Sequence, residues 1–514
     1  MAADIIPIAQ AALPPRRATI PSDLWLYVAI ALMTVAIRAP VFADLNYHID
    51  EGFYLLVGDR MREGLLPYAD IWDRKPLGLF LVYGAIAAIS RGSIVAVHLG
   101  ASICAAGNAA LIALIARRWV APVPAVTAAI AYLAALETLA GGGGQSPVFY
   151  NLPVSAMAWL TLRAHDARSI ARVRVLARFA VACGGIALTI KQTCLPECLF
   201  FGIVLTHNVY RLALGWRLVV REAALLASIG ALPTLACLLF YTVIGYGSDY
   251  LFATMLSNFG RMPMAWSERA ALASYLAPRI LPLLLCALAG VALLWRQARP
   301  NGAQLLLSGW IASSLAGFLM VPNFYDHYAL PLLPSLCVAA AFLFARHPLG
   351  PIFAAIVIAS SLALAGWPAF DRTRATNAAM QTAARTIAAH GGDRSLYVFD
   401  GPVHLYTLVG APLPTRWVFP EHLSTAEEHG ATGADAAREL TAILKRRPAV
   451  IVAAGQPGAR HPHPAAWHAV RTALAAEYTK VATIEVPEFG GSRVIGIFAL
   501  HTRKAAASSS PPAR

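Results

Sequence analysis

The chain has 514 residues, of which 58% are hydrophobic and 13% are charged, and its formal net charge is +14. Soluble domains carry about 25% charged residues, so the composition excludes an ordinary soluble protein. The basic residues lie at the ends of apolar runs. This placement favours control of membrane topology and contact with anionic lipids over the binding of nucleic acid.

Apolar runs of roughly 18 or more residues recur along the chain and are typical of membrane-spanning helices. Arg16 and Arg17 precede the first run, which we interpret as a signal anchor with a cytoplasmic N-terminus. The later arginine-rich connections can all lie in the cytoplasm only if Pro76–Ser90 does not cross the membrane. As a helix these residues span about 22 Å, short of a hydrocarbon core of about 30 Å. We therefore expect an interfacial or re-entrant helix there.

This topology predicts eleven crossings and places the C-terminal tail outside the cytoplasm. The crossings are expected at about 24–42, 94–116, 120–140, 147–162, 176–190, 194–208, 223–246, 270–294, 304–321, 329–345 and 350–368. If 76–90 crosses instead, the connection with five arginines at 163–178 moves outside. That alternative is less favourable under the positive-inside rule.

The first outer loop, at about 44–92, contains the charged stretch HIDEGFYLLVGDRMREGLLPYADIWDRKPLG. It begins with Asp50 and Glu51, and paired carboxylates can act as a general base or hold a divalent cation. The same pair also suits a helix N-terminus, with Asp50 capping a helix that starts at Gly52. From the pair alone, both interpretations stay open.

Cations follow in the same loop. Asp73, Arg74 and Lys75 precede Pro76 at the predicted membrane interface. Arg74 and Lys75 suit a phosphate or diphosphate there, although anchoring to lipid headgroups is a common role for interfacial cations.

Later outer-face segments add further candidates for substrate binding. Lys191 lies between two short apolar segments, where a lysine needs a partner or a path to water. Arg261 lies in an outer loop and can meet an anionic ligand or solvent. Tyr325, Asp326, His327 and Tyr328 lie at the mouth of a predicted helix, where His327 can bind a phosphate, a metal or a sugar hydroxyl. An aromatic belt explains the tyrosines well, but it explains Asp326 and His327 less well.

The tail reads as a small α/β domain, because apolar runs of period 2 alternate with runs of period 3.6. We expect strands at Ser395–Phe399, Ala449–Ala453, Lys480–Val486 and Arg493–Leu500, and helices at Arg372–Ala389, Thr425–Arg446 and Ala465–Ala476. The predicted division is a transmembrane domain at 1–370, an extracytoplasmic α/β domain at 371–503 and a disordered tail at 504–514. The fold class is therefore an all-α polytopic membrane domain with a small C-terminal α/β domain.

The seven cysteines lie in or beside apolar segments and show no CxxC or Cys/His spacing. A disulfide scaffold and a structural zinc site are disfavoured.

The stretch DEGFYLLVGDRMREGLLPYADIWDRKPLG resembles the first external loop of GT-C glycosyltransferases of the protein-mannosyltransferase and aminoarabinose-transferase superfamily, the family 39-like group. Members carry an Asp-Glu pair followed at a distance by an Asp-x-Lys-Pro or Asp-Lys-Pro-Pro element. LTIKQTCLP, FYDHYALPLLPSL and GAPLPTRWVFPEHL also follow in a similar order. The likeness covers most of the chain and is most specific in the first loop.

The resemblance implies an inverting transferase that uses a polyprenyl-phosphate sugar. Asp50 matches the family's catalytic base, with Glu51 beside it, and Lys75 matches the cation at the lipid phosphate. Arg261 and the segment 325–328 match by order and side of the membrane. Members often carry a second acid before a middle span, where this chain has Asn151. We therefore assign no metal or other cofactor, and a divalent cation stays open.

Two functions from different classes follow. The first is a hexosyl- or pentosyltransferase of the bacterial inner membrane, with a polyprenyl-phosphate-sugar donor and a glycan, lipid or protein acceptor. The alternative is a transporter or flippase of a polyprenyl-linked substrate, which typically shows inverted repeats and charges near the bilayer midplane. The predicted charges gather on one face, and this favours the enzyme.

The topology predicts where the C-terminus lies. A reporter that fluoresces only in the cytoplasm, fused after Arg514, should stay dark because eleven crossings place the tail outside. A bright fusion would contradict the predicted topology.

Overall fold

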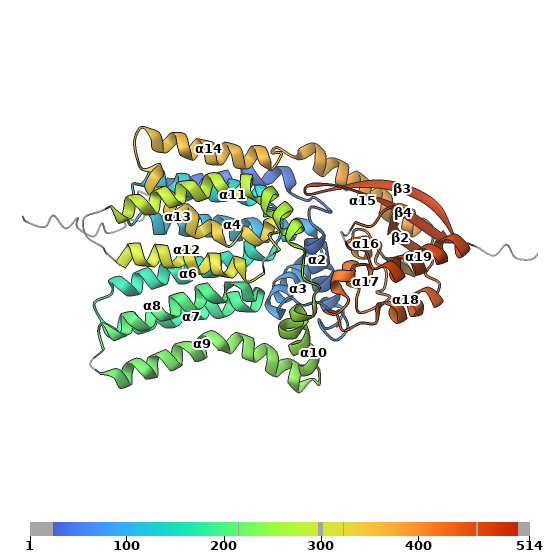
Figure 1. The fold of residues 1–514 in the computed structure, drawn as a ribbon, viewed down its shortest axis with the longest axis horizontal. Helices are drawn as coiled ribbons and strands as arrows, with labels where there is room; N and C mark the ends of the chain where they lie inside the picture. The colour runs from blue at the N-terminus through green and yellow to red at the C-terminus, as the bar shows by residue number, and fades with distance from the viewer. Residues whose placement is uncertain (1–23, 214, 297–301, 322, 459–460, 502–514) are drawn as a thin grey trace, which may run out of the picture.

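The computed structural model describes residues 24–213, 215–296, 302–321, 323–458 and 461–501. Arg16, Arg17 and the predicted disordered tail at 504–514 lie outside these residues. A long helical bundle occupies one side of the molecule, and a small sheet with its helices occupies the other (Figure 1).

Within the described ranges, each of the eleven predicted crossings contains one helix. These helices are α1 (Leu24–Arg38), α4 (Ile94–Ala116), α5 (Pro122–Thr138), α6 (Ser146–Asp166), α7 (Ile170–Ile190), α8 (Leu195–Tyr210), α9 (Trp216–Val243), α11 (Trp266–Trp295), α12 (Gly302–Leu319), α13 (Leu332–Phe344) and α14 (Leu349–Leu364). In the same ranges, five helical segments are long and apolar enough to cross a membrane: those of α1, α4, α7, α9 and α11.

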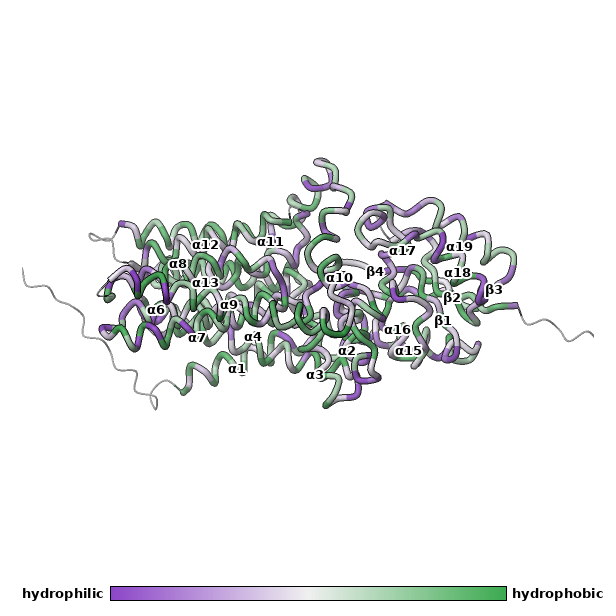
Figure 2. The backbone as a smooth tube through the Cα atoms, turned by 90° about the horizontal axis from the view of Figure 1, so that it is seen from below, coloured by the Kyte–Doolittle hydropathy of each residue, from purple (hydrophilic) through white to green (hydrophobic). Residues whose placement is uncertain are grey.

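Apolar residues dominate the bundle (Figure 2). Large apolar side chains such as Leu32, Leu199 and Leu239 are exposed on it. Exposed apolar surface on this scale marks contact with another apolar phase, here the membrane. The chain is therefore a multi-pass membrane protein. The exact number of crossings stays a prediction.

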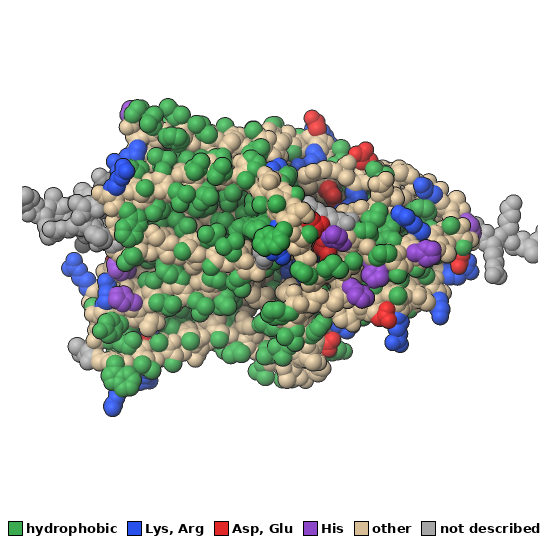
Figure 3. All heavy atoms as spheres, in the orientation of Figure 1, with side chains coloured by type: hydrophobic (Ala, Val, Ile, Leu, Met, Phe, Trp, Pro, Cys, Tyr) green, Lys and Arg blue, Asp and Glu red, His purple; other side chains and the backbone are tan. Residues whose placement is uncertain are grey.

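A group of Lys and Arg side chains lies at the end of the bundle away from the sheet (Figure 3). Arg118 pairs with Asp166, and an Arg211 guanidinium N–H donates to the His165 carbonyl at 2.8 Å. These contacts place the ends of α4, α6 and α8 together. Which membrane face this end meets stays a prediction.

The helix at the predicted interfacial segment, α3 (Leu77–Ser90), begins and ends at the opposite end of the bundle, near α2 (Ile49–Arg62). The Ala43 amide, just after α1, donates to His98 Nδ1 in the first turns of α4 at 2.9 Å. Arg38 Nε, at the end of α1, donates to Ser102 at 2.9 Å. The chain thus leaves α1 and enters α4 at the same end, so the segment between them makes no net crossing of the bundle.

Helix α2 does not start at Gly52, as the capping interpretation expected. The helix begins at Ile49, and His48 caps it by accepting the Asp50 N–H at 3.2 Å. Asp50 and Glu51 lie in the first turn, where negative side chains favour the helix dipole. The interpretation of Asp50 as the cap of a helix starting at Gly52 is therefore wrong.

The C-terminal domain, defined here as the segment from α15 to β4, contains all four expected strands. They are β1 (Leu396–Val398), β2 (Val450–Ala454), β3 (Tyr478–Glu488) and β4 (Gly491–Leu500), in the sheet order β1-β2-β4-β3. The β1–β2 pair is parallel, with Leu396 opposite Val450, and the other two pairs are antiparallel.

The longer helices of this domain are α15 (Phe370–Ala389), α18 (Ala436–Lys445) and α19 (Pro464–Glu477). The helix expected at Thr425–Arg446 is shorter than predicted, because Asp435 caps α18 by accepting the Arg438 N–H at 3.1 Å. Before Asp435 the chain forms short elements instead. The short elements among the described residues are α10 (Gly247–Leu251), α16 (Leu405–Val409), α17 (Glu421–Ser424), the π-helix η4 (Phe252–Leu256), and the 3₁₀-helices η2 (Ala39–Val41), η3 (Gln192–Cys194), η5 (Ser257–Gly260), η6 (Asp326–Ala329) and η7 (Ala426–Glu428).

The C-terminal domain covers the charged first loop. The Trp72 N–H donates to the Arg416 carbonyl at 2.8 Å, and the Arg60 guanidinium donates to the Ala411 carbonyl at 2.7 Å. Although α2 is rich in charged residues, Glu51, Asp59 and Arg60 are buried. The loop thus lies as a layer between the helical bundle and the C-terminal domain.

Helices α2 and α3 cross very closely at Gly58. A Cβ at this position would lie 2.6 Å from the Tyr83 carbonyl carbon and 2.8 Å from the Gly84 nitrogen. Both are backbone atoms, so they cannot move aside as a flexible side chain would. The crossing that holds α2 under the C-terminal domain therefore requires glycine.

Gly58→Ala should destabilise the protein by about 1–3 kcal/mol, the usual range for overpacking. Gly202→Ala in α8 is the matched control, because a Cβ there would meet no atom within 4 Å and alanine favours a helix. Thermal unfolding in detergent measures both. Equal melting temperatures for the two variants would contradict the close crossing.

Candidate active site

A pocket of about 100 Å³ lies where the first loop, the α7–α8 corner, the loop before α11 and the end of α12 meet. It is lined by Arg74, Lys75, Pro76, Tyr150, Lys191, Gln192, Thr193, Asn258, Arg261, Gly317, Phe318, Val321, Tyr328 and Pro331. The structure thus brings together four predicted cations from three separated parts of the chain.

The two lysines of the pocket have different surroundings. Lys75 Nζ lies 3.8 Å from Asp73 Oδ1, which also accepts the Lys75 backbone N–H at 2.7 Å. Burial would lower the pKa of Lys75, but Asp73 and Asp50 raise it above the usual range. Lys191 Nζ lies 4.6 Å from the centre of the Tyr328 ring, a cation–π distance. Burial and the charge of Lys75 lower the pKa of Lys191 to about 8.

The two arginines of the pocket share one carboxylate. Both guanidinium ends of Arg74 donate to Glu428 of the C-terminal domain, at 3.0 Å from Nη1 to Oε1. Arg261 Nη2 lies 2.9 Å from the same Oε1. Glu428 is 3% exposed.

Asp50 carries the carboxylate beside these cations. Its side chain is half-buried, and among the described residues its carboxylate makes no hydrogen bond or close ion pair. Burial would raise its pKa, but Lys75, His48, His327 and Lys191 together hold the pKa well below the usual range. Asp50 is therefore ionised at neutral pH and free to accept a proton or a hydrogen bond.

The predicted aromatic segment lies against His48, two residues before Asp50. The rings of His48 and His327 lie 5.3 Å apart, and the His327 ring is 4.7 Å from Tyr328 and 6.0 Å from Tyr325. The His327 N–H donates to Asp326 at 2.7 Å. Burial and His48 lower the pKa of His327, which favours its neutral form.

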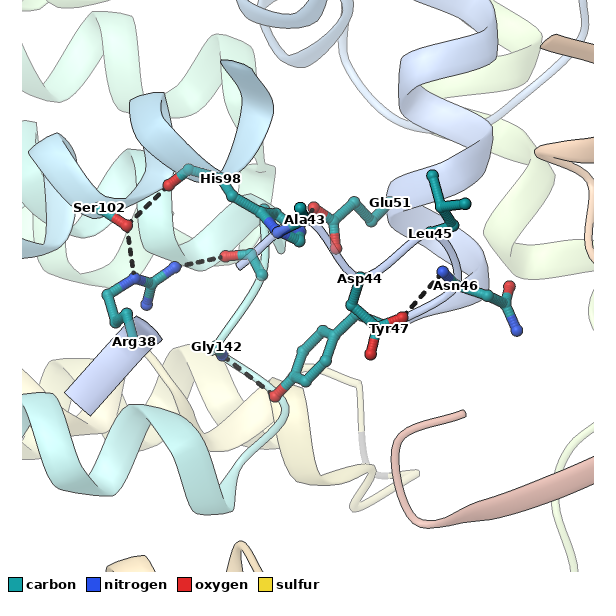
Figure 4. Close-up of polar contacts among 12 residues, drawn as sticks. Arg38, Ala43, Asp44, Leu45, Asn46, Tyr47, Glu51, His98, Ser102 and Gly142 are labelled. Carbon is teal, nitrogen blue, oxygen red and sulfur yellow. Dashed lines mark hydrogen bonds and ion pairs between the residues drawn. The ribbon is translucent and has the colours of Figure 1, made fainter. Parts of the chain in front are cut away.

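Glu51 does not accompany Asp50. It is 2% exposed, and its Oε1 lies 2.7 Å from His98 Nε2 (Figure 4). Because His98 Nδ1 accepts the Ala43 N–H, the ring proton belongs on Nε2, facing Glu51. A Cβ on Gly143 would lie 2.2 Å from Glu51 Oε2, so the loop between α5 and α6 packs tightly on the carboxylate. The expected pair is thus divided, and Glu51 belongs to the interior of the bundle.

Sequence reasoning missed two residues of this site that belong to the C-terminal domain. Glu428 joins Arg74 and Arg261, and His422 Nε2 lies 3.7 Å from Asp73 Oδ2. His422 lies in the segment GAPLPTRWVFPEHL, whose order in the chain was a usable signal. Glu428 follows in a stretch predicted to be helical and carries no signal of its own.

The described residues offer no cluster of metal ligands. In the described part of the chain, no group of three or more His, Cys, Asp or Glu side chains could hold a metal ion. Asn151, which stands where the resemblance led us to look for a second acid, donates to the Leu330 carbonyl at 3.0 Å and joins α6 to the start of α13.

No known protein family matches the chain, and no curated protein matches it. The chain is similar to solved structures that include two of ArnT. ArnT from Cupriavidus metallidurans in the apo state has a TM-score of 0.62 and 16% identity, covering 93% of this chain and 98% of that chain. ArnT from Cupriavidus metallidurans bound to undecaprenyl phosphate has a TM-score of 0.58 and 14% identity, covering 92% and 98%. These likenesses show that the chain has the GT-C fold, and they confirm the fold expected from the first loop.

Proposed function

We propose that the chain is a glycosyltransferase that moves a sugar from a polyprenyl-phosphate donor to an acceptor at the outer face of the membrane. The observation that carries the proposal is the meeting of Lys75, Lys191, Arg74 and Arg261 in one pocket beside the free carboxylate of Asp50. Cations that converge on a small pocket bind phosphate well, and a neighbouring base serves a transfer reaction. The GT-C fold supports this assignment.

The donor phosphate fits between Lys75 and Lys191. Because each of these charges faces the other, an anion placed between them relieves their repulsion. Leu188 and Leu195, which flank Lys191 in the chain, line an apolar cavity of about 700 Å³ between α7, α8 and α9. An isoprenoid chain suits this lining, and the fold neighbour ArnT bound to undecaprenyl phosphate supports such a ligand.

Asp50 then acts as general base. As the acceptor oxygen forms its bond to the anomeric carbon, the acceptor proton passes to the Asp50 carboxylate. The bond from the anomeric carbon to the phosphate oxygen breaks, and its electron pair leaves with the phosphate. Lys75 and Lys191 compensate the charge that develops there. Attack opposite the leaving group inverts the anomeric centre, and no covalent sugar–enzyme intermediate is required.

Donor binding also prepares the base. In the empty pocket Lys75, His48, His327 and Lys191 lower the pKa of Asp50 and make it a weak base. A bound phosphate shares the two lysines and weakens their hold on the Asp50 carboxylate. Asp50 therefore becomes a stronger base when the donor is bound, so it takes up a proton mainly from the acceptor during transfer.

The transporter alternative has less support. A transporter of a lipid-linked anion needs charges near the middle of the bilayer. The four pocket cations lie instead at one end of the bundle, next to the C-terminal domain.

Asp50→Asn keeps the shape of the side chain but removes the base. The variant should bind donor and turn over at least ~10²-fold more slowly, the lower end of the effect of general-base catalysis. Transfer of radiolabelled sugar from a polyprenyl-phosphate donor measures this. Asp70→Asn is the control, because Asp70 accepts the Leu66 N–H in the same loop and an asparagine oxygen can replace it. Near-normal turnover by Asp50→Asn would remove Asp50 from the mechanism.

The low pKa of Lys191 predicts a pH dependence. Above a pH of about 8 Lys191 loses its charge in the empty pocket, so affinity for polyprenyl phosphate should fall as pH rises from 7.5 to 9.5. A fall of about tenfold corresponds to the loss of one charge-assisted contact. Lys191→Arg should abolish this fall, because arginine stays charged. Identical pH profiles for wild type and Lys191→Arg would contradict the role of Lys191.

A further inference from the structure

Glu428 is a buried carboxylate that the transfer step does not use, yet it contacts two pocket cations. It ends η7 in the C-terminal domain, accepts both guanidinium ends of Arg74 and lies 2.9 Å from Arg261. Burial would raise its pKa, but Arg74 and Arg261 lower it to about 2. Glu428 is thus ionised at neutral pH and leaves the two arginines with one excess positive charge.

Holding the C-terminal domain in place does not require this carboxylate. Arg416 lies 3.2 Å from Asp249 of α10 and donates to the Tyr68 carbonyl at 2.6 Å, and Trp72 and Arg60 bond to backbone carbonyls of the same domain. Burying a charge costs free energy even when it is paired. A charge placed on two arginines of a phosphate pocket therefore calls for a role in that pocket.

The charge of the ligand changes during the proposed reaction. The donor is a phosphodiester with one negative charge. The product is a phosphate monoester, which carries about 1.5 to 2 negative charges at pH 7. A pocket with two lysines and two unpaired arginines would hold the product much more tightly than the donor, and release would become slow.

We propose that Glu428 is a resident counter-anion that occupies Arg74 and Arg261 and so limits how tightly the pocket holds the phosphate product. The inference rests on the proposed function, because it assumes that the pocket binds a polyprenyl phosphate. Glu428 acts through the arginines and is a positioning residue. It fixes their orientation, and its charge sets the balance between binding and release.

Glu428→Gln tests the inference because glutamine keeps the size and an accepting oxygen but removes the charge. Undecaprenyl phosphate is titrated into the full-length protein in nanodiscs of zwitterionic lipid. The Kd of Glu428→Gln should fall about tenfold below that of wild type, with a steeper dependence on salt. In turnover assays, KM for the donor and kcat should both fall, and inhibition by undecaprenyl phosphate should become stronger.

Asp249→Asn is the matched control, because it removes an interdomain ion pair with Arg416 outside the pocket. Its Kd should equal that of wild type. Arg261→Gln serves if Glu428→Gln does not fold. In Arg261→Gln, Glu428 pairs with Arg74 alone and neutralises it. The Kd of this variant for undecaprenyl phosphate should therefore rise about tenfold, and product inhibition should weaken.

The outcomes separate the two proposals. A wild-type protein that does not bind undecaprenyl phosphate would overturn the proposed function and this inference with it. Binding by wild type together with equal or weaker binding by Glu428→Gln would overturn the inference alone. An unchanged Kd for Arg261→Gln would do the same.

Discussion

Mutual repulsion among four cations is the constraint on which the architecture around the pocket depends. Arg74, Lys75, Lys191 and Arg261 share a half-buried space in which charges are poorly screened. Each has a compensating group: Asp73 for Lys75, the Tyr328 ring for Lys191 and Glu428 for both arginines. The pocket is therefore stable while empty, and it still has positive charge available for an anion.

The compensating groups come from both parts of the molecule. Glu428 and His422 reach the pocket from the C-terminal domain, whereas Asp73 belongs to the first loop. The close crossing at Gly58 keeps α2 beneath that domain. On the far side of α2, Arg38 donates to the carbonyls of Gly141 and Gly143 at 2.9 and 3.0 Å and fixes the loop that packs on Glu51. The site thus depends on contacts of the first loop with the C-terminal domain and on contacts of α2 with the helical bundle.

Local signals in the sequence predicted most of the fold. Apolar runs located the helices of all eleven expected crossings, and alternating apolar residues located the four strands. The arginine distribution predicted that α3 makes no net crossing, in agreement with the contact between Ala43 and His98. The helix expected at Thr425–Arg446 was too long, because the cap at Asp435 was not recognised against a continuous helical pattern.

The candidate site was predicted in part. Each cation or aromatic at a membrane boundary is a weak signal alone, but the predicted topology gathered Lys75, Lys191, Arg261 and Tyr328 on one face, and the structure places them together. The partners could not be found in this way. Whether Glu51 faces the pocket or the bundle depends on helix rotation, and the contact of Glu428 with Arg74 joins residues far apart in the chain. Neither depends on local sequence.

The most direct test of the central claim is a structure of the protein with undecaprenyl phosphate in nanodiscs, determined by electron cryomicroscopy. The account predicts a phosphate between Lys75 and Lys191, with the isoprenoid chain along the cavity of α7, α8 and α9 and with Asp50 open to an acceptor. A phosphate bound away from the two lysines, or an isoprenoid chain that blocks Asp50, would contradict it.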